Sequence, residues 1–387
     1  MSVLKNDELI FNLIKIGLWD ESIILPSSVD WKLLYDFFNE HAILPLTANC
    51  MDRIVISEKI KPAWKERVLQ QIYHYYSIVR VQNKLLESLN GLNVVVIKGT
   101  SAAKYYPKPH LRTMGDIDLL VKPEDYEASV CRLLSIGCVE ITCQAELELG
   151  RHRSFRYKDV TIELHRFFSL YVDEDKGNVL DDLLFDAIAA DESELPDVEN
   201  GLVILSHIRQ HLEDGIGLRQ IIDWMMFVNS CLDDHLWHES FQKKAQRTGL
   251  EQLAITVTKM CQKYLGLTTS NITWCRIADD ELCEYLMQYI MECGNFGRTR
   301  EILQSGGASK IPSIYHPLQL FKYIQKRGEK NWRVINKHPL LKPFAWVYQS
   351  CRYIKIAVRN RVGAKKLRDI YGEGDKRNEM YIALGLK

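Results

Sequence analysis

The sequence predicts an α+β fold in which a small α/β core lies between two helical regions. Apolar residues recur every three to four positions in residues 1–90 and again after residue 200, as they do on one face of a helix. Between these regions lie short β-branched or alternating runs that are typical of strands. With 47% hydrophobic and 26% charged residues, the composition supports a large buried core and excludes a disordered chain.

The N-terminal region is predicted to be helical because no part of it alternates with the period of a strand. Its clearest helix covers residues 63–89 and follows Pro62, a residue type that favours the first turn of a helix. Apolar side chains form one stripe along this helix: Trp64, Val68, Ile72, Tyr75, Val79, Leu86 and Leu89. We therefore expect a long amphipathic helix directly before the core.

The core begins with a strand at Val94–Ile97, since four consecutive β-branched residues suit a short buried strand. A short helix over residues 101–106 follows. A loop that contains two prolines and a glycine then leads to a second strand over residues 116–121.

The second half of the core starts at Pro123, which opens an amphipathic helix that ends at Gly137. A third strand is expected over residues 139–143. Residues 153–157 and 160–167 flank a polar Lys-Asp pair, which predicts a β-hairpin.

Helical patterns return after an acid-rich connector that contains one helix around residues 180–190. The later helices are predicted over residues 202–212, 218–228, 235–245, 250–265 and 281–291. These patterns divide the chain into four parts: an N-terminal helical region (1–90), the α/β core (91–199), a C-terminal helical domain (200–319) and a basic helical C-terminal segment (320–387).

Charge is distributed unevenly, although 50 basic and 50 acidic residues make the whole chain neutral. Residues 320–368 contain 14 Lys and Arg residues and one acidic residue, whereas residues 1–319 have a net charge of −12. Basic residues interleaved with aromatic ones fit contact with RNA, an acidic protein partner, the acidic body of the same chain, or solvent. We expect the segment to fold onto the acidic body or to contact an acidic partner. A nucleic-acid partner is not favoured, because the opposed charges shorten the reach of the positive field.

The ten cysteines form no C-x-x-C pair, which argues against a zinc knuckle and predicts reduced thiols. The N-terminal residues are acidic where a signal peptide carries Lys or Arg. No apolar run approaches the roughly 18 residues of a membrane span. We therefore expect a cytoplasmic protein with no membrane partner.

Asp116 and Asp118 are the first candidates for chemistry. Side chains two residues apart on a strand project from the same face, so these two carboxylates repel each other unless a cation lies between them. Oxygen ligands in this arrangement suit Mg²⁺, which binds one or two carboxylates together with substrate phosphates. Solvated acids on a strand face are the alternative.

Two further motifs strengthen the metal-site hypothesis. The first strand ends at Gly99 and Thr100, where a glycine lets backbone N–H groups approach an anion and a hydroxyl adds a donor. Glu163 lies between apolar residues on a later strand. If that strand lies beside the strand of Asp116 and Asp118, three carboxylates converge.

These motifs resemble the nucleotidyltransferases of the DNA polymerase β-like superfamily. Four longer strings are similar to those of its uncharacterised nucleotidyltransferase family: Val-Ile-Lys-Gly-Thr at 96–100, Leu-Arg-Thr-Met-Gly-Asp-Ile-Asp-Leu-Leu-Val at 111–121, Ile-Glu-Leu-His at 162–165 and Gly-Leu-Arg-Gln-Ile-Ile-Asp-Trp at 217–224. The resemblance implies a small mixed-sheet nucleotidyltransferase core flanked by helical regions. It also implies that Asp116, Asp118 and Glu163 are the catalytic residues and hold Mg²⁺ or Mn²⁺.

The activity that the resemblance implies is transfer of a nucleoside monophosphate from a nucleoside triphosphate, such as ATP, to a hydroxyl or phosphate of a small molecule, peptide or protein. Gly99 and Thr100 would contact the phosphates, and Lys98 and Arg112 would neutralise their charge. The alternatives are a nucleotide-binding or regulatory module without turnover and an RNA-modifying nucleotidyltransferase that uses the basic segment.

For the remaining candidate residues, a functional role and a purely structural role both fit the sequence. His165 either contacts nucleotide or is a buried structural residue. Arg219 and Asp223, four residues apart on one helix, either line the nucleotide or acceptor pocket or pair with each other. The histidines at 207 and 211 have a spacing that can chelate zinc, but no third ligand lies nearby in sequence, so we expect a helix face near the active cleft.

Overall fold

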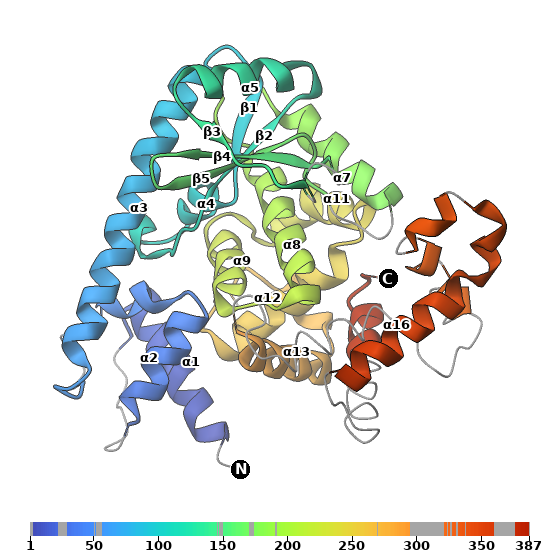
Figure 1. The fold of residues 1–387 in the computed structure, drawn as a ribbon. Coiled ribbons are helices and arrows are strands. Elements are labelled where there is room, and N and C mark those ends of the chain that lie inside the picture. The colour runs from blue at the N-terminus through green and yellow to red at the C-terminus, as the bar shows by residue number, and fades with distance from the viewer. Residues whose placement is uncertain are drawn as a thin grey trace. The chain divides into compact units, whose positions relative to one another are not determined.

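The structure, a computed structural model, is mostly helical and contains one mixed sheet of five strands, which confirms the predicted α+β fold (Figure 1). It describes residues 3–21, 29–49, 51, 56–144, 146, 150–169, 174–189, 192–268, 270–294, 321–322, 324–325, 327–329, 332–336, 338–359 and 376–386. The chain divides into two compact units. Unit 1 comprises Met1–Leu212, Ile216–Phe296 and Leu384–Lys387, and unit 2 comprises Glu213–Gly215 and Gly297–Ala383.

The N-terminal part of unit 1 is helical, as predicted. It contains α1 (Val3–Trp19), α2 (Trp31–Glu40), the 3₁₀ helix η1 (Leu44–Asn49) and α3 (Lys61–Leu89). Helix α3 has 29 residues, with Pro62 in its first turn, and extends from the first two helices to the sheet (Figure 1). Its second half buries Ile78, Val81 and Leu85, whereas the predicted stripe included Val79 and Leu86. The stripe shifts by one residue because this half packs on the sheet.

The sheet has the strand order β1-β2-β5-β4-β3. Its strands are β1 (Val94–Ile97), β2 (Ile117–Val121), β3 (Val139–Glu140), β4 (His152–Tyr157) and β5 (Val160–His165). Strands β2 and β5 are parallel, and the other neighbouring pairs are antiparallel. The predicted hairpin is present as β4 and β5, which turn at Lys158 with a φ of 53°.

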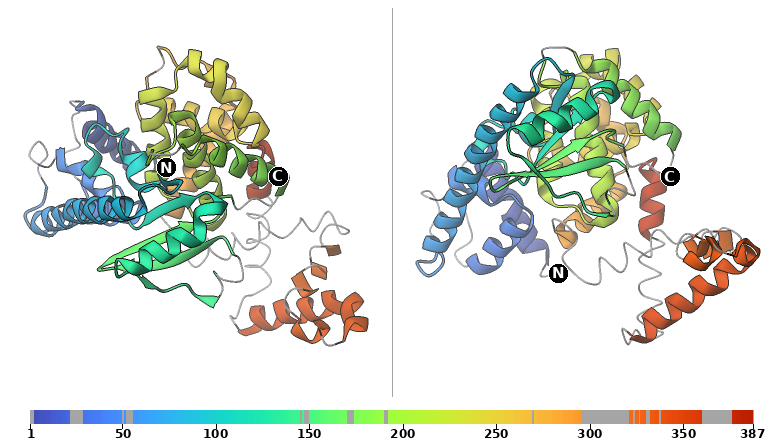
Figure 2. Two further views of the ribbon diagram at one scale, coloured as in Figure 1. Left: turned by 90° about the horizontal axis from the view of Figure 1, so that it is seen from above. Right: turned by 45° about the horizontal axis from the view of Figure 1, so that its top comes forward.

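One face of the sheet forms the main core. Alternate strand residues, among them Val96, Leu119 and Leu164, pack with buried residues of α3 and of α5 (Tyr126–Ser135). Because side chains alternate along a strand, the intervening residues project from the opposite face. Figures 1 and 2 show α5 on one side of the sheet, and α8 (Asp197–Asp214) and α9 (Leu218–Cys231) on the other.

The remaining helices of unit 1 follow the predicted order, except that the predicted helix over residues 235–245 is divided. A π-helical turn, Trp237–Phe241, lies between its two α-helical parts. These helices are α4 (Gly99–Ala103), α7 (Glu174–Ala187), α10 (Asp234–Leu236), α11 (Gln242–Arg247), α12 (Glu251–Tyr264) and α13 (Asp280–Cys293), with 3₁₀ turns η2 (Pro109–Leu111), η3 (Pro123–Asp125) and η5 (Trp274–Ile277). Trp237 is buried and stacks on Trp274, with ring centroids 3.8 Å apart.

Unit 2 contains the described part of the predicted basic segment. Its elements are η6 (Arg333–Asn336), η7 (Pro339–Phe344) and α16 (Ala345–Arg359). Trp332 stacks on Tyr348 within this unit, with ring centroids 5.2 Å apart. Residues 320, 323, 326, 330, 331, 337 and 360–368 of this segment lie outside the described residues, and the docking of the segment stays a prediction.

Candidate functional site

A strained turn joins β1 to α4. Lys98 has a φ of 57° and Gly99 a φ of 36°, so the chain takes two consecutive residues of positive φ. A lysine in this conformation is strained, and such strain persists only where the surroundings hold it. A Cβ at position 99 would lie 3.3 Å from the Cε atom of Met114, so the turn lies against the loop that leads to the acidic residues.

The strand register brings the predicted carboxylates together. Ile97 pairs with Asp118 across the first two strands, and Asp118 pairs with Glu163 across the parallel strands β2 and β5. Asp116 directly precedes β2 and is two residues from Asp118, so both side chains project to the same side. The three acidic residues therefore share one face of the sheet, opposite the main core, next to the turn at Lys98.

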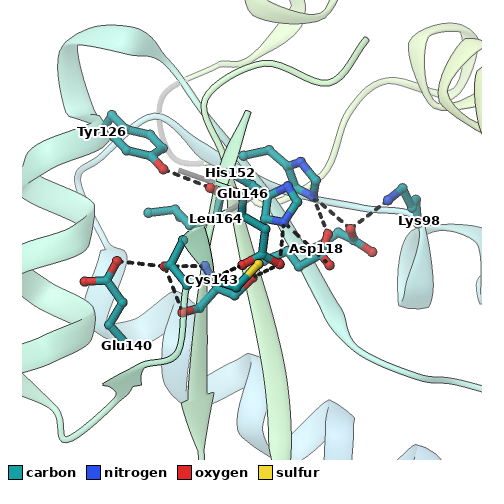
Figure 3. Close-up of polar contacts among 12 residues, drawn as sticks. Lys98, Asp118, Tyr126, Glu140, Cys143, Glu146, His152 and Leu164 are labelled. Atoms are coloured by element: carbon teal, nitrogen blue, oxygen red, sulfur yellow. Dashed lines mark hydrogen bonds and ion pairs between the residues drawn. The ribbon is translucent and has the colours of Figure 1, made fainter. Parts of the chain in front are cut away.

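Asp118 is buried, with a side-chain exposure of 4%, and it has two partners. Its Oδ1 atom accepts a hydrogen bond from Nζ of Lys98 at 2.7 Å (Figure 3). It accepts a second hydrogen bond from Nε2 of His165 at 2.9 Å. Burial alone would raise the pKa of Asp118. The charge of Lys98 and the hydrogen bond from His165 outweigh burial and hold that pKa well below its ordinary range.

Asp116 is half-buried and behaves in the opposite way. Burial and the neighbouring charge of Asp118 raise its pKa from the ordinary value of 3.8 to about 6. The charge of Lys98 partly opposes this effect, Glu163 adds to it, and Arg219 opposes it less. The fold therefore holds an acidic residue whose negative charge is not fully compensated by the protein.

Replacing Asp116 with Asn should stabilise the metal-free protein. Because the pKa of Asp116 is raised in the fold, its contribution to stability is present below pH about 4 and is lost as the pH rises to about 6. At pH 7.5 and with EDTA present, we expect the variant to gain about 1–3 kcal/mol in the free energy of unfolding. Thermal melts at pH 7.5 and pH 3.5 test this. A gain of the same size at both pH values would contradict the electrostatic explanation.

Two histidines flank Glu163. His165 is two residues further along the same strand, and its Nε2 atom lies 3.3 Å from Oε2 of Glu163. His152 pairs with His165 across β4 and β5, and its Nε2 atom lies 3.9 Å from Oε1 of Glu163. Burial raises the pKa of Glu163, but hydrogen bonding to His165 lowers it below the ordinary value overall. Burial also lowers the pKa of His152.

His152 was missed by the sequence prediction, in which the hairpin began one residue later. The signal that could have identified it is the hairpin itself. Once the turn is placed at Lys158, antiparallel pairing sets His152 opposite His165. Glu146, from the loop before β4, lies 3.5 Å from Nε2 of His152 (Figure 3).

Arg112 and Asp223 are brought together, although they are 111 residues apart in sequence. The Arg112 guanidinium donates two hydrogen bonds of 2.7 Å to the carboxylate, and the hydroxyl of Tyr106 donates a third. Both charged side chains are 3% exposed. The Arg112 cation is therefore engaged by Asp223, and its predicted contact with the triphosphate stays a prediction.

The hydrogen-bonded partner of Asp223 is thus not Arg219. Arg219 is half-buried, and its Nη1 atom donates to the carbonyl of Thr113 at 3.2 Å. Its Nε atom has no hydrogen-bond partner among the described residues. The hydroxyl of Thr100 donates to the Gln82 side chain at 2.7 Å, so it is directed to α3.

His207 and His211 lie on α8, and their Nε2 atoms are 2.9 Å apart. Burial lowers the pKa of His207 well below its ordinary value, and the charges of Lys98 and Asp118 are close enough to affect it. Both histidines therefore lie on α8, within reach of the charges of Lys98 and Asp118, and their place beside an active cleft stays a prediction.

The donor atoms of the site fit a hard divalent cation. Asp116, Asp118 and Glu163 supply carboxylate oxygens, which are the ligands that Mg²⁺ and Mn²⁺ prefer. The raised pKa of Asp116 shows that the protein alone leaves negative charge there without a full counterion. The ammonium group of Lys98 forms an ion pair with Asp118 in the structure. A metal ion at this site would therefore share the Asp118 carboxylate with Lys98.

A strand, a tight glycine turn and three carboxylates on one face of a mixed sheet define a nucleotidyltransferase-like core. The family model for uncharacterised nucleotidyltransferases matches residues 27–266. The chain belongs to this family, which confirms the resemblance seen in the sequence. A search of curated proteins and a search of solved structures each returned no match. Among the described residues, no helix is both long and apolar enough to span a membrane.

Proposed function

We propose that the chain is a nucleotidyltransferase that requires Mg²⁺ or Mn²⁺. It would transfer a nucleoside monophosphate from a nucleoside triphosphate to a hydroxyl or phosphate of a small-molecule, peptide or protein acceptor. The observation that carries this proposal is the placement of Asp116, Asp118 and Glu163 on one face of adjacent strands. Membership of the nucleotidyltransferase family supports it.

The three carboxylates would hold the divalent ion. When bound, the ion supplies positive charge to the triphosphate and polarises its phosphoryl oxygens. In the proposed reaction the acceptor oxygen forms a bond to the α-phosphorus while the bond to pyrophosphate breaks. Glu163 is 25% exposed and its pKa is lowered, so it is an ionised carboxylate that can accept the proton of an acceptor hydroxyl.

The cations suited to the triphosphate are Lys98 and Arg219. Lys98 lies at the turn beside the carboxylates, and Arg219 has an Nε–H without a hydrogen-bond partner among the described residues. Arg112 instead holds α9 through Asp223, and the loop between Arg112 and Asp116 carries the Thr113 carbonyl that Arg219 contacts. Arg112 would therefore position that loop and Arg219 together.

The direct test is incubation of the purified protein with each labelled nucleoside triphosphate, Mg²⁺ and a cell extract, followed by identification of the labelled product. We expect a label from the α-phosphate and none from the γ-phosphate, since pyrophosphate leaves. Asp116→Asn is the inactive control. Binding of a triphosphate without transfer under any condition would favour the non-catalytic module. Labelling confined to RNA would favour the RNA-modifying alternative.

A further inference from the structure

His152, Glu163 and His165 form a compact group on the face of the sheet that bears the carboxylates. One ligand atom from each of the three lies within 4.8 Å of the others. Two features of the sheet produce this group. Glu163 and His165 are two apart on β5, and His152 is the cross-strand partner of His165, with ring centroids 5.0 Å apart. Regular strand pairing therefore holds all three side chains together.

Three of the four ring nitrogens of His152 and His165 are buried without a hydrogen-bond partner among the described residues. His165 is fully buried, and its Nδ1 atom has no hydrogen-bond partner among the described residues. Neither ring nitrogen of His152 has one either. Since buried polar atoms are nearly always hydrogen-bonded in folded proteins, the unpartnered Nε2 of His152, which lies 3.9 Å from Glu163, indicates that a ligand is missing there.

The donor set determines which ligand fits. Two imidazole nitrogens and one carboxylate oxygen suit borderline transition metals such as Zn²⁺, Co²⁺ or Mn²⁺, whereas Mg²⁺ prefers oxygen ligands alone. Neighbouring ligand atoms around such an ion lie about 3 Å apart. The separation of 3.3 Å between His165 and Glu163 fits this geometry, and the 3.9 Å separation between His152 and Glu163 needs only a small side-chain rotation.

We propose that His152, Glu163 and His165 form a binding site for a divalent transition-metal ion, adjoining the Asp116–Asp118 pair through the shared Glu163. This inference rests on the proposed function, because it assigns a different class of ion to one side of the same site. Glu146 lies on the same side of His152, with its Oε1 atom 3.5 Å from the same Nε2 atom, and hydrogen bonds from the Cys143 amide and the Ser154 hydroxyl hold its carboxylate in place.

Binding also requires His165 to change tautomer. In the structure Nε2 of His165 donates its hydrogen to Asp118. When a metal takes this nitrogen, the neutral imidazole carries its single hydrogen on Nδ1, which has no hydrogen-bond partner among the described residues.

The experiment is titration of EDTA-treated, full-length protein with Co²⁺, followed by its visible absorption, and with Zn²⁺, followed by calorimetry. His152→Ala is the main variant, because His152 has 13% side-chain exposure whereas His165 has none. We expect tight binding of Zn²⁺ to the unaltered protein. A residue that only orients a ligand contributes about 10–100-fold to metal affinity, so loss of a direct ligand should cost at least about tenfold.

The matched control is His235→Ala, which removes a histidine that is 81% exposed. It should bind Co²⁺ and Zn²⁺ like the unaltered protein. If His152→Ala unfolds in thermal melts, His152→Gln keeps much of the side-chain volume and serves instead. Equal affinity in the His152 and His235 variants would overturn the inference.

The outcomes separate this inference from the proposed function. Nucleotidyl transfer with Mg²⁺, but no binding of Co²⁺ or Zn²⁺, would overturn the transition-metal site and leave the proposed function intact. Transition-metal binding that depends on His152, without any transfer of label, would support the site and count against the proposed function.

Discussion

Replacing either Asp116 or Asp118 with Asn should lower nucleotidyl transfer at least about 100- to 1,000-fold. Each change removes one carboxylate charge from the set that would hold the divalent ion against the triphosphate. It also leaves the strand, the turn at Lys98 and the neighbouring Glu163 in place. The loss should appear in kcat and in Mg²⁺-dependent nucleotide binding.

The two variants should differ in stability, which makes the prediction sharper. Asp118 neutralises Lys98 and accepts a hydrogen bond from His165, so its replacement leaves a nearly buried ammonium group without its counterion. We expect Asp118→Asn to destabilise the fold. Asp116→Asn should stabilise it, for the reason given above. Loss of activity in a variant that is more stable than the natural protein cannot be attributed to unfolding.

The measurements are the rate of label transfer and the midpoint of urea unfolding for each variant. Glu124→Gln is the matched control, since Glu124 is an exposed acidic residue shortly after β2. It should retain both activity and stability. Transfer at the natural rate in both Asn variants would remove the two aspartates from the mechanism.

Removing the Arg112 side chain should produce the largest loss of stability. The change to Ala leaves the buried Asp223 carboxylate without the two hydrogen bonds that compensate its burial. Breaking a buried ion pair from one side typically costs about 3–5 kcal/mol. We expect a decrease of this size in the free energy of unfolding, together with weaker binding of triphosphate because the Thr113 loop loses its support.

The double variant Arg112→Ala with Asp223→Ala tests the cause. It should lose less stability than the sum of the two single variants, because removing both partners leaves no unpaired charge. Arg80→Ala, which removes an exposed arginine on α3, serves as the control and should change stability by less than about 0.5 kcal/mol. If Arg112→Ala costs no more than this control, the pair has no structural importance.

Local patterns were enough to predict the fold class and the common face of Asp116 and Asp118. Side chains alternate on any strand, so placing Asp116 and Asp118 on one face required only the strand prediction. The hairpin was likewise predictable from its polar turn between apolar runs. Helix α13 follows from apolar periodicity, since it has exposed and buried sides, whereas α9 is buried over Gln220–Val228.

The partners of the charged residues could not be predicted in this way. The i, i+4 spacing on α9 left open whether Arg219 and Asp223 line a pocket or pair with each other, and Asp223 pairs with Arg112 from a distant loop. Asp223 lies on a buried part of α9, and only the packing of the Arg112 loop against that helix brings the two hydrogen bonds of the guanidinium to its carboxylate.

The sequence by itself determined most helices and strands, and which side chains of a strand share a face. Both depend on the spacing of residues that are only a few positions apart. The tertiary structure decided which strands are neighbours. The parallel pairing of β2 with β5 set Glu163 beside Asp118, and the antiparallel pairing of β4 with β5 added His152. Such pairings depend on how the whole sheet buries its apolar face against α3 and α5, so no local pattern in the chain specifies them.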